Sequence, residues 1–248
     1  MMKKFLVFVL FGLIGCTKAP LGPQEIVDAS IDFSGTEKLR NASVTFDFRN
    51  INYEYSRKKV SFMYVRIQRD TASNQIKDVL SNDGLVRLIN GEEMDITEER
   101  RTAYSSSVNS VMYFGFLPLW LNDPAVNKFY IGTMAMDGKE YHKIKITFSE
   151  EGGGEDFEDV FYYWFDTEDY SMDYLAYSYI EEDGTGMRFR KAYNARTING
   201  VIIQDYVNMK PKSKELLLTE IDKAYMEGAL EQLSLIELKN VDILTDKK

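Results

Sequence analysis

The strongest constraint on the fold is a series of short alternating segments joined by two-residue turns. Asp137-Gly138 lies between KFYIGTMAM and KEYHKIKITF, and Asn199-Gly200 lies between GMRFRKAYNAR and VIIQDYVNM. Asp-Gly and Asn-Gly are preferred in the type I′ turn, which joins neighbouring antiparallel strands. Alternation of apolar and polar residues is typical of strands with two unlike faces. The chain is therefore expected to fold mainly as sequential β-hairpins.

One long helix interrupts the strands, over residues 96–116, where Asp95 and Glu98 have the spacing of a capping box and Pro118 ends the segment. Shorter helices are expected near both ends of the chain, the first ending at Gly35. Strand–helix alternation, which parallel sheets require, is absent from the pattern. The predicted fold is mainly β (α+β), a curved antiparallel sheet or half-barrel of roughly nine to eleven strands with an inserted helix.

The N-terminus has the pattern of a bacterial lipoprotein signal. Lys3 and Lys4 precede an apolar run over 5–11, and Leu-Ile-Gly-Cys over 13–16 resembles a lipobox. Cys16 is the only cysteine of the chain. The apolar run is too short to span a bilayer, which favours a cleaved signal over an anchor helix. Cys16 is therefore the expected site of lipidation, and its acyl chains would hold the protein to a membrane.

This reading divides the chain into a signal peptide (1–15), a tether rich in proline (16–24) and a single antiparallel β half-barrel domain (25–248). The lipobox resemblance implies export and a place in the cell envelope. Thr17 rather than aspartate follows the cysteine, which favours the outer membrane, and the lack of an acidic cluster just after Cys16 favours a lipoprotein that faces the periplasm. The net charge of −9 and the lack of a basic block argue against a nucleic-acid partner.

A cluster of glycines and acids over 146–166 raises the question of a metal site. Glu151, Asp156 and Asp159 could supply oxygens to calcium, but the spacing matches no EF-hand. A solvated hairpin tip is the preferred interpretation, because the flanking strands are already complete. No metal ion or cofactor is predicted.

His142, the only histidine, shares the apolar face of its predicted strand with Ile144 and Ile146. A histidine in the protein core is the preferred interpretation. The alternative is a periplasmic enzyme that uses His142 with carboxylates near the glycine turn. No GxSxG, HExxH, Walker or GxGxxG motif supports a particular reaction.

Aromatic side chains fall on both faces of the strands VFYYWF and YLAYSY, so both faces are expected to be covered. A cavity on the concave face is one way to cover them, and an ordinary aromatic core is the other. The candidate ligand-binding residues are Phe148, Trp164, Tyr177, Phe189 and Tyr193.

Several segments, among them IKDVLSNDG, YHKIKITFSEEGGGEDFEDVFYYWF and FRKAYNARTINGVIIQDYVNMKP, together with the lipobox, resemble an uncharacterised Bacteroidetes lipoprotein family. The expected architecture is similar to the LolA/LppX lipoprotein-carrier superfamily, which implies an apolar cavity for acyl chains. The leading hypothesis is a membrane-anchored periplasmic lipoprotein that binds a lipid or other apolar ligand and is not an enzyme. A structural envelope protein without a small ligand remains an alternative, and protein partners are not predicted.

Overall fold

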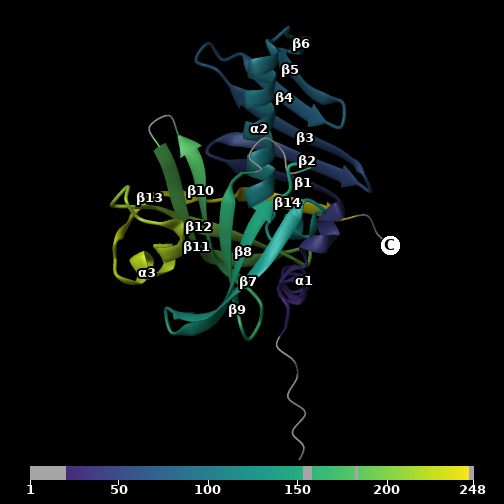
Figure 1. Cartoon of the computed structure of the whole chain (residues 1–248). Helices are drawn as coiled ribbons and strands as arrows, with labels where there is room; N and C mark the ends of the chain where they lie inside the picture. Colours follow the sequence, from purple (N-terminus) through teal and green to yellow (C-terminus); the bar gives the residue numbers. More distant parts are fainter. Residues whose placement is uncertain (1–20, 153–157, 182–183, 246–248) are drawn as a thin grey trace, which may run out of the picture.

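A computed structural model describes residues 21–152, 158–181 and 184–245. Within these residues, fourteen strands form two seven-stranded antiparallel sheets, which confirms the predicted fold class. The strands number more than expected: β2 (INYEYSRK) alternates apolar and polar residues and follows β1 after a turn of two residues, whereas β4 (QIKDVLS) lacks a clear apolar alternation. The first sheet lies in the upper part of Figure 1 and the second in the lower part, and they meet beside α2.

The first sheet has the spatial order β14-β1-β2-β3-β4-β5-β6, and each strand beyond β1 pairs with its predecessor in the chain. Its members are β1 (Asn41–Phe48), β2 (Ile51–Lys58), β3 (Ser61–Arg69), β4 (Gln75–Ser81), β5 (Gly84–Ile89), β6 (Glu92–Glu93) and β14 (Lys239–Thr245).

The second sheet has the order β13-β12-β11-β10-β9-β8-β7. Its members are β7 (Val126–Met136), β8 (Lys139–Phe148), β9 (Val160–Asp166), β10 (Met172–Glu181), β11 (Gly184–Ile198), β12 (Val201–Pro211) and β13 (Leu230–Ile236). Only Glu237 and Leu238 separate β13 from β14, so the chain passes directly from an edge of the second sheet to an edge of the first.

The two turns predicted from sequence join β7 to β8 and β11 to β12. Asp137 and Gly138 have φ angles of 48° and 83°, and Asn199 and Gly200 have φ angles of 48° and 77°. Positive φ at both central residues is the requirement of the type I′ turn. These hairpins are confirmed.

The helices are α1 (Pro23–Ser34), α2 (Glu98–Gly115) and α3 (Ile221–Met226), with short 3₁₀ turns η1 (Thr36–Arg40), η2 (Leu119–Asn122) and η3 (Leu218–Glu220). Because α1 begins at Pro23, the end of the expected tether belongs to a helix. The N-cap of α2 is Thr97, whose hydroxyl accepts from the amide of Arg100, and not Asp95. Among the helices of the described residues, none combines the length and apolarity needed to cross a membrane.

Gly35, the C-cap of α1, lies so close to the backbone of Gly200 that a side chain would not fit there. Its φ is 66°, and a Cβ at this position would come within 2.2 Å of the carbonyl oxygen of Gly200. Glycine therefore allows α1 to end against the β11–β12 turn.

Three hydrophobic cores follow from this arrangement. The first packs Val108 and Met112 of α2 against the first sheet. The second packs α1 and the chain after α2 against the inner face of the second sheet. The third packs Ile221 and Ala224 of α3 against the outer face of that sheet. The helices α1 and α3 thus lie on opposite sides of the second sheet (Figure 1).

Candidate functional site

A cavity of about 630 Å³ lies where α2 meets both sheets, and we call it the central cavity. The helix contributes Ser107, Ser110, Val111 and Phe114 to its wall. The first sheet and its β1–β2 turn contribute one part of the remaining wall and strands β10 to β13 contribute another. Those residues are Phe48, Arg49, Ile51, Tyr53, Arg66, Tyr177, Tyr179, Arg188, Arg190, Gln204, Tyr206, Asn208, Leu233, Ser234 and Ile236, with Gly115 and Leu238 beside them.

Strand alternation decides which side chains of β11 reach the cavity. Arg188 and Arg190 line it, whereas Met187 and Phe189 belong to the core on the opposite face. Across the sheet, Arg190 pairs with Asn208 of β12. Asn208 in turn pairs with Ser234 of β13 and donates to its hydroxyl at 3.1 Å. A row of polar side chains therefore crosses three strands on the cavity face.

Among the described residues, every charged side chain that lines the central cavity is positive. Four arginines line it, and no aspartate or glutamate is among the described lining residues. This contrasts with the whole chain, which carries a net charge of −9. The cavity is thus an apolar and aromatic space with basic groups in its wall.

One of the four arginines, Arg66, is neutralised by a carboxylate. Its Nε and Nη2 donate to Asp78 at 2.9 and 2.7 Å, and Arg87 donates to the same carboxylate at 2.6 Å. Asp78 is completely buried. Arg66 also donates to the hydroxyl of Ser107 at 2.7 Å, so this network ties α2 to the first sheet.

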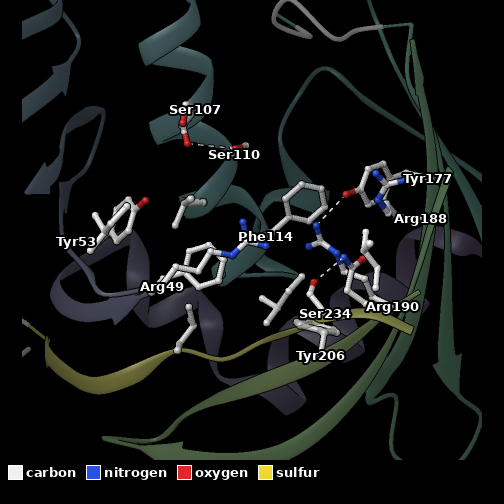
Figure 2. A pocket seen from close by; sticks show the side chains of 18 of the residues that line it. Arg49, Tyr53, Ser107, Ser110, Phe114, Tyr177, Arg188, Arg190, Tyr206 and Ser234 are labelled. Carbon is white, nitrogen blue, oxygen red and sulfur yellow. Dashed lines mark hydrogen bonds between the residues drawn. The ribbon is translucent and has the colours of Figure 1, made fainter. Parts of the chain in front are cut away.

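Arg190 has a different environment. Its side chain is only 8% exposed, and its Cζ lies 3.9 Å from the centroid of the Phe114 ring. Its Nη2 donates to the hydroxyl of Tyr177 at 2.8 Å, while its Nε has no partner. Figure 2 shows Phe114, Arg190 and Tyr177 gathered in one part of the cavity, with the hydrogen bond dashed.

Burial raises the pKa of two tyrosines in the cavity wall, Tyr53 and Tyr206. The pKa of Tyr206 rises to about 12. Burial likewise raises the pKa of Tyr113 and of Tyr163, whose hydroxyls lie 3.1 Å apart. These four tyrosines therefore add no negative charge near the cavity.

The five candidate ligand-binding residues do not gather around one cavity. Tyr177 lines the central cavity, and Phe148 lines a smaller hollow of about 250 Å³ beside Trp120. Trp164 and Phe189 are fully buried in the core under α3, on the outer face of the second sheet. Tyr193 donates to Glu237 at 3.2 Å. The sequence places aromatic residues on both faces of the strands and does not show which face borders a cavity. The five candidates therefore lie in different parts of the structure.

His142 is half-buried rather than enclosed in the core. Its Nδ1 lies 3.3 Å from the hydroxyl of Tyr130, and burial holds its pKa below the usual value. No carboxylate makes a hydrogen bond or ion pair with it within the described ranges. The neighbours of the imidazole are aromatic rings instead. The ring of Tyr170 stacks on it, with the two ring centroids 6.3 Å apart.

The other candidate positions lie partly outside the described residues. Cys16 and Asp156 fall there. Glu151 is exposed, and Asp159 lies just before β9. Across residues 21–152, 158–181 and 184–245, no group of three or more His, Cys, Asp or Glu side chains could hold a metal ion.

Sequence reasoning did not identify Arg190. The signal was available in MRFRKAY, where two arginines alternate with apolar residues on one strand. Such a pattern is usually that of a solvated face, and only the position of α2 shows that this face is covered.

Comparison with known proteins adds the following findings. Residues 2–238 match the model of a family described as "Family of unknown function (DUF6503)". No curated protein sequence matches the chain. A LolA superfamily protein from Nitrosomonas europaea has a similar structure, with a TM-score of 0.51 and 8% identity over 92% of this chain and 96% of that chain. The predicted resemblance in fold to the LolA superfamily is thereby confirmed.

Two further solved structures are more distant. A DUF1329 family protein from Desulfovibrio piger gives a TM-score of 0.43 and 9% identity over 90% of this chain and 93% of that one. The lipoprotein LppX from Mycobacterium tuberculosis gives 0.26 and 12% identity over 61% and 85%. These scores carry no argument about function.

Proposed function

The chain belongs to the DUF6503 family of unknown function, and from its own residues we propose that it binds a lipid acyl chain or similar apolar ligand in the central cavity. The observation that carries this proposal is the cavity itself. Its volume of about 630 Å³ falls within the range of small-molecule sites. Its walls include the rings of Phe48, Phe114 and Tyr177, which would remove an acyl chain from water.

The energetics favour an elongated apolar ligand. Each methylene group that leaves water contributes about 0.8 kcal/mol. A chain of ten such groups would gain about 8 kcal/mol before the cost of association. The LolA-type fold supports the same reading, because the resemblance to that superfamily implies a cavity for acyl chains.

We also propose that the protein is a lipoprotein of the cell envelope, anchored through Cys16 to the outer membrane and facing the periplasm. The lipobox over 13–16 supports this location. Cys16→Ser should leave an unprocessed precursor that incorporates no radiolabelled palmitate. A variant that is still cleaved and labelled would contradict the anchor.

Ligand binding can be tested with the full-length protein in an amphipathic polymer and the neutral probe N-phenyl-1-naphthylamine. The parent should enhance probe fluorescence, and native mass spectrometry should detect co-purified lipid. Ser110→Trp places a large ring in the cavity from α2 and should reduce probe binding about tenfold or more. Ala103→Trp is the matched control, because Ala103 is exposed on the same helix and is not among the lining residues.

Two results would contradict the proposal. The first is a parent protein that carries no lipid and does not bind the probe. The second is equal probe binding by Ser110→Trp and the parent, which would place the probe elsewhere. The alternative of a structural envelope protein would then be favoured.

A further inference from the structure

We propose that the central cavity selects amphiphiles with an anionic oxygen headgroup, a carboxylate or a phosphate, and that Arg190 binds this headgroup. The inference rests on the proposed function, because the same cavity would hold the acyl chain. It adds a ligand class and a residue that determines specificity.

Arg190 differs from the other buried cations in lacking a carboxylate partner among the described residues. Three positively charged side chains in the described part of the chain are at least nine-tenths buried: Arg66, Lys143 and Arg190, at 7%, 8% and 8% exposure. Arg66 has a carboxylate partner in Asp78, and Lys143 has one in Asp222. Arg190 has none among the residues that the structure describes. A buried charge without a counter-charge is costly, so a missing anion is expected at this position.

The guanidinium of Arg190 has two partners that position it. Its Nη2 donates to the hydroxyl of Tyr177, and its Cζ lies over the ring of Phe114. Its Nε is buried and has no acceptor, although Arg190 lines the cavity. The cation–π contact offsets part of the cost of burial but cannot satisfy an N–H group. An oxyanion in the cavity would accept from it, and arginine suits both carboxylate and phosphate.

The surroundings of Arg190 also favour an anion. Arg188 lies on the same face two residues earlier in β11, and among the described residues no carboxylate lines the cavity. Directly across on β12, Asn208 is 6% exposed and its Oδ1 has no donor. Two cross-strand neighbours on one wall thus each carry a buried polar atom without a partner, Nε of Arg190 and Oδ1 of Asn208. A headgroup with an anionic oxygen and a hydroxyl would satisfy both.

The experiment uses displacement of N-phenyl-1-naphthylamine from the full-length protein by hexadecyl phosphate, palmitate, 1-hexadecanol and inorganic phosphate. The parent should bind the two anionic amphiphiles about tenfold or more tighter than hexadecanol. Arg190→Gln should lower the affinity for the two anionic amphiphiles about tenfold or more and so abolish their preference over hexadecanol. Arg190→Lys, which keeps the charge, should retain part of the preference. Arg69→Gln, at an exposed arginine outside the cavity wall, is the control.

The outcomes separate the two proposals. Equal affinity of the parent for anionic and neutral chains, or a preference that survives Arg190→Gln, would overturn the role of Arg190 but leave acyl binding intact. Displacement of the probe by inorganic phosphate alone would show that a free anion, not a lipid headgroup, is the ligand, and would also overturn the inference. If no amphiphile and no probe binds, the proposed function fails as well. Unfolding curves of each variant would show whether a loss of binding reflects a loss of structure.

Discussion

The guanidinium of Arg190 on β11 lies over the ring of Phe114 on α2, with Cζ 3.9 Å from the ring centroid. This contact joins the second sheet to the helix that covers the first sheet. It forms one wall of the central cavity, so the orientation of Arg190 depends on the position of α2.

A double-mutant cycle should measure this coupling. Arg190→Met and Phe114→Leu each keep apolar volume but remove one partner of the cation–π contact. We expect a coupling energy of about 1 kcal/mol in the free energy of unfolding, because a partly desolvated cation–π pair has that magnitude. Urea unfolding of the four proteins gives the value. Strict additivity of the two substitutions would contradict an energetic role for the contact.

The buried carboxylate of Asp78 should be far more important for stability. Asp78→Asn leaves Arg66 and Arg87 without a counter-charge, and breaking a buried pair of this kind costs about 3–5 kcal/mol. The free energy of unfolding can be measured by urea titration. Asp242→Asn is the control, because Asp242 is exposed on β14 of the same sheet and its replacement should change stability by less than about 0.5 kcal/mol. Similar losses from the two substitutions would argue against the network.

The hairpins were predictable because their signals are local. Asp137-Gly138 and Asn199-Gly200 tolerate the positive φ angles that a type I′ turn needs, so two residues are enough to predict each turn. The end of α1 at Gly35 is local in the same way. The start of α2 was less certain, because Asp95 and Thr97 are both good capping residues and only the backbone path selects Thr97.

The site was less predictable because it depends on contacts that are distant in the chain. Phe114 and Arg190 are far apart in sequence, and nothing local shows that α2 lies over β11. Trp164 illustrates the same difficulty, since it alternates with Phe161 and Tyr163 in an ordinary strand pattern. The short helix α3 covers the Trp164 face and closes a core there. The opposite face of β9 packs against α1 and the chain after α2, and the sheet borders the cavity only at β10 to β13.

Asp137 should give a stability difference that depends on pH. The hydrogen bond from Lys191, with two others from Tyr225 and Tyr174, holds the pKa of Asp137 below its usual value. A depressed carboxyl pKa contributes stability above the unfolded-state pKa of about 3.9, and that stability is lost as pH falls through the folded-state pKa. Asp137→Asn keeps a residue that tolerates positive φ but removes the charge.

We expect Asp137→Asn to lower the free energy of unfolding by about 1 kcal/mol at pH 7, a modest value because Asp137 is partly exposed and screened by solvent. The difference from the parent should shrink near pH 3 in urea titrations. Asp83→Asn, in the exposed turn between β4 and β5, should show no such dependence. A difference that stays constant from pH 7 to pH 3 would exclude the ionised carboxylate as its cause.

The fluorescence emission of Trp164 should respond to changes in the packing of α3 and not to ligand binding in the central cavity. Trp164 is fully buried on the outer face of the second sheet, where its Nε1 lies 3.1 Å from the sulfur of Met134 and the Lys143 ammonium lies 5.3 Å from its ring. In a Trp120→Phe background it is the only tryptophan. Its emission should not move when hexadecanol or palmitate fills the central cavity. Asp222→Ala, which leaves Lys143 buried without its partner, should shift the emission to the red as α3 loosens.

The matched control is the double variant Lys143→Met with Asp222→Leu, which replaces the ion pair by apolar side chains. It should restore blue-shifted emission and most of the stability, because exchanging a buried pair for apolar groups is often close to neutral. Fluorescence spectra and urea titrations of the three proteins test this ordering. A ligand-induced shift of Trp164 in the Trp120→Phe background would instead place the acyl chain on the α3 side of the sheet. The central cavity would then not be the binding site.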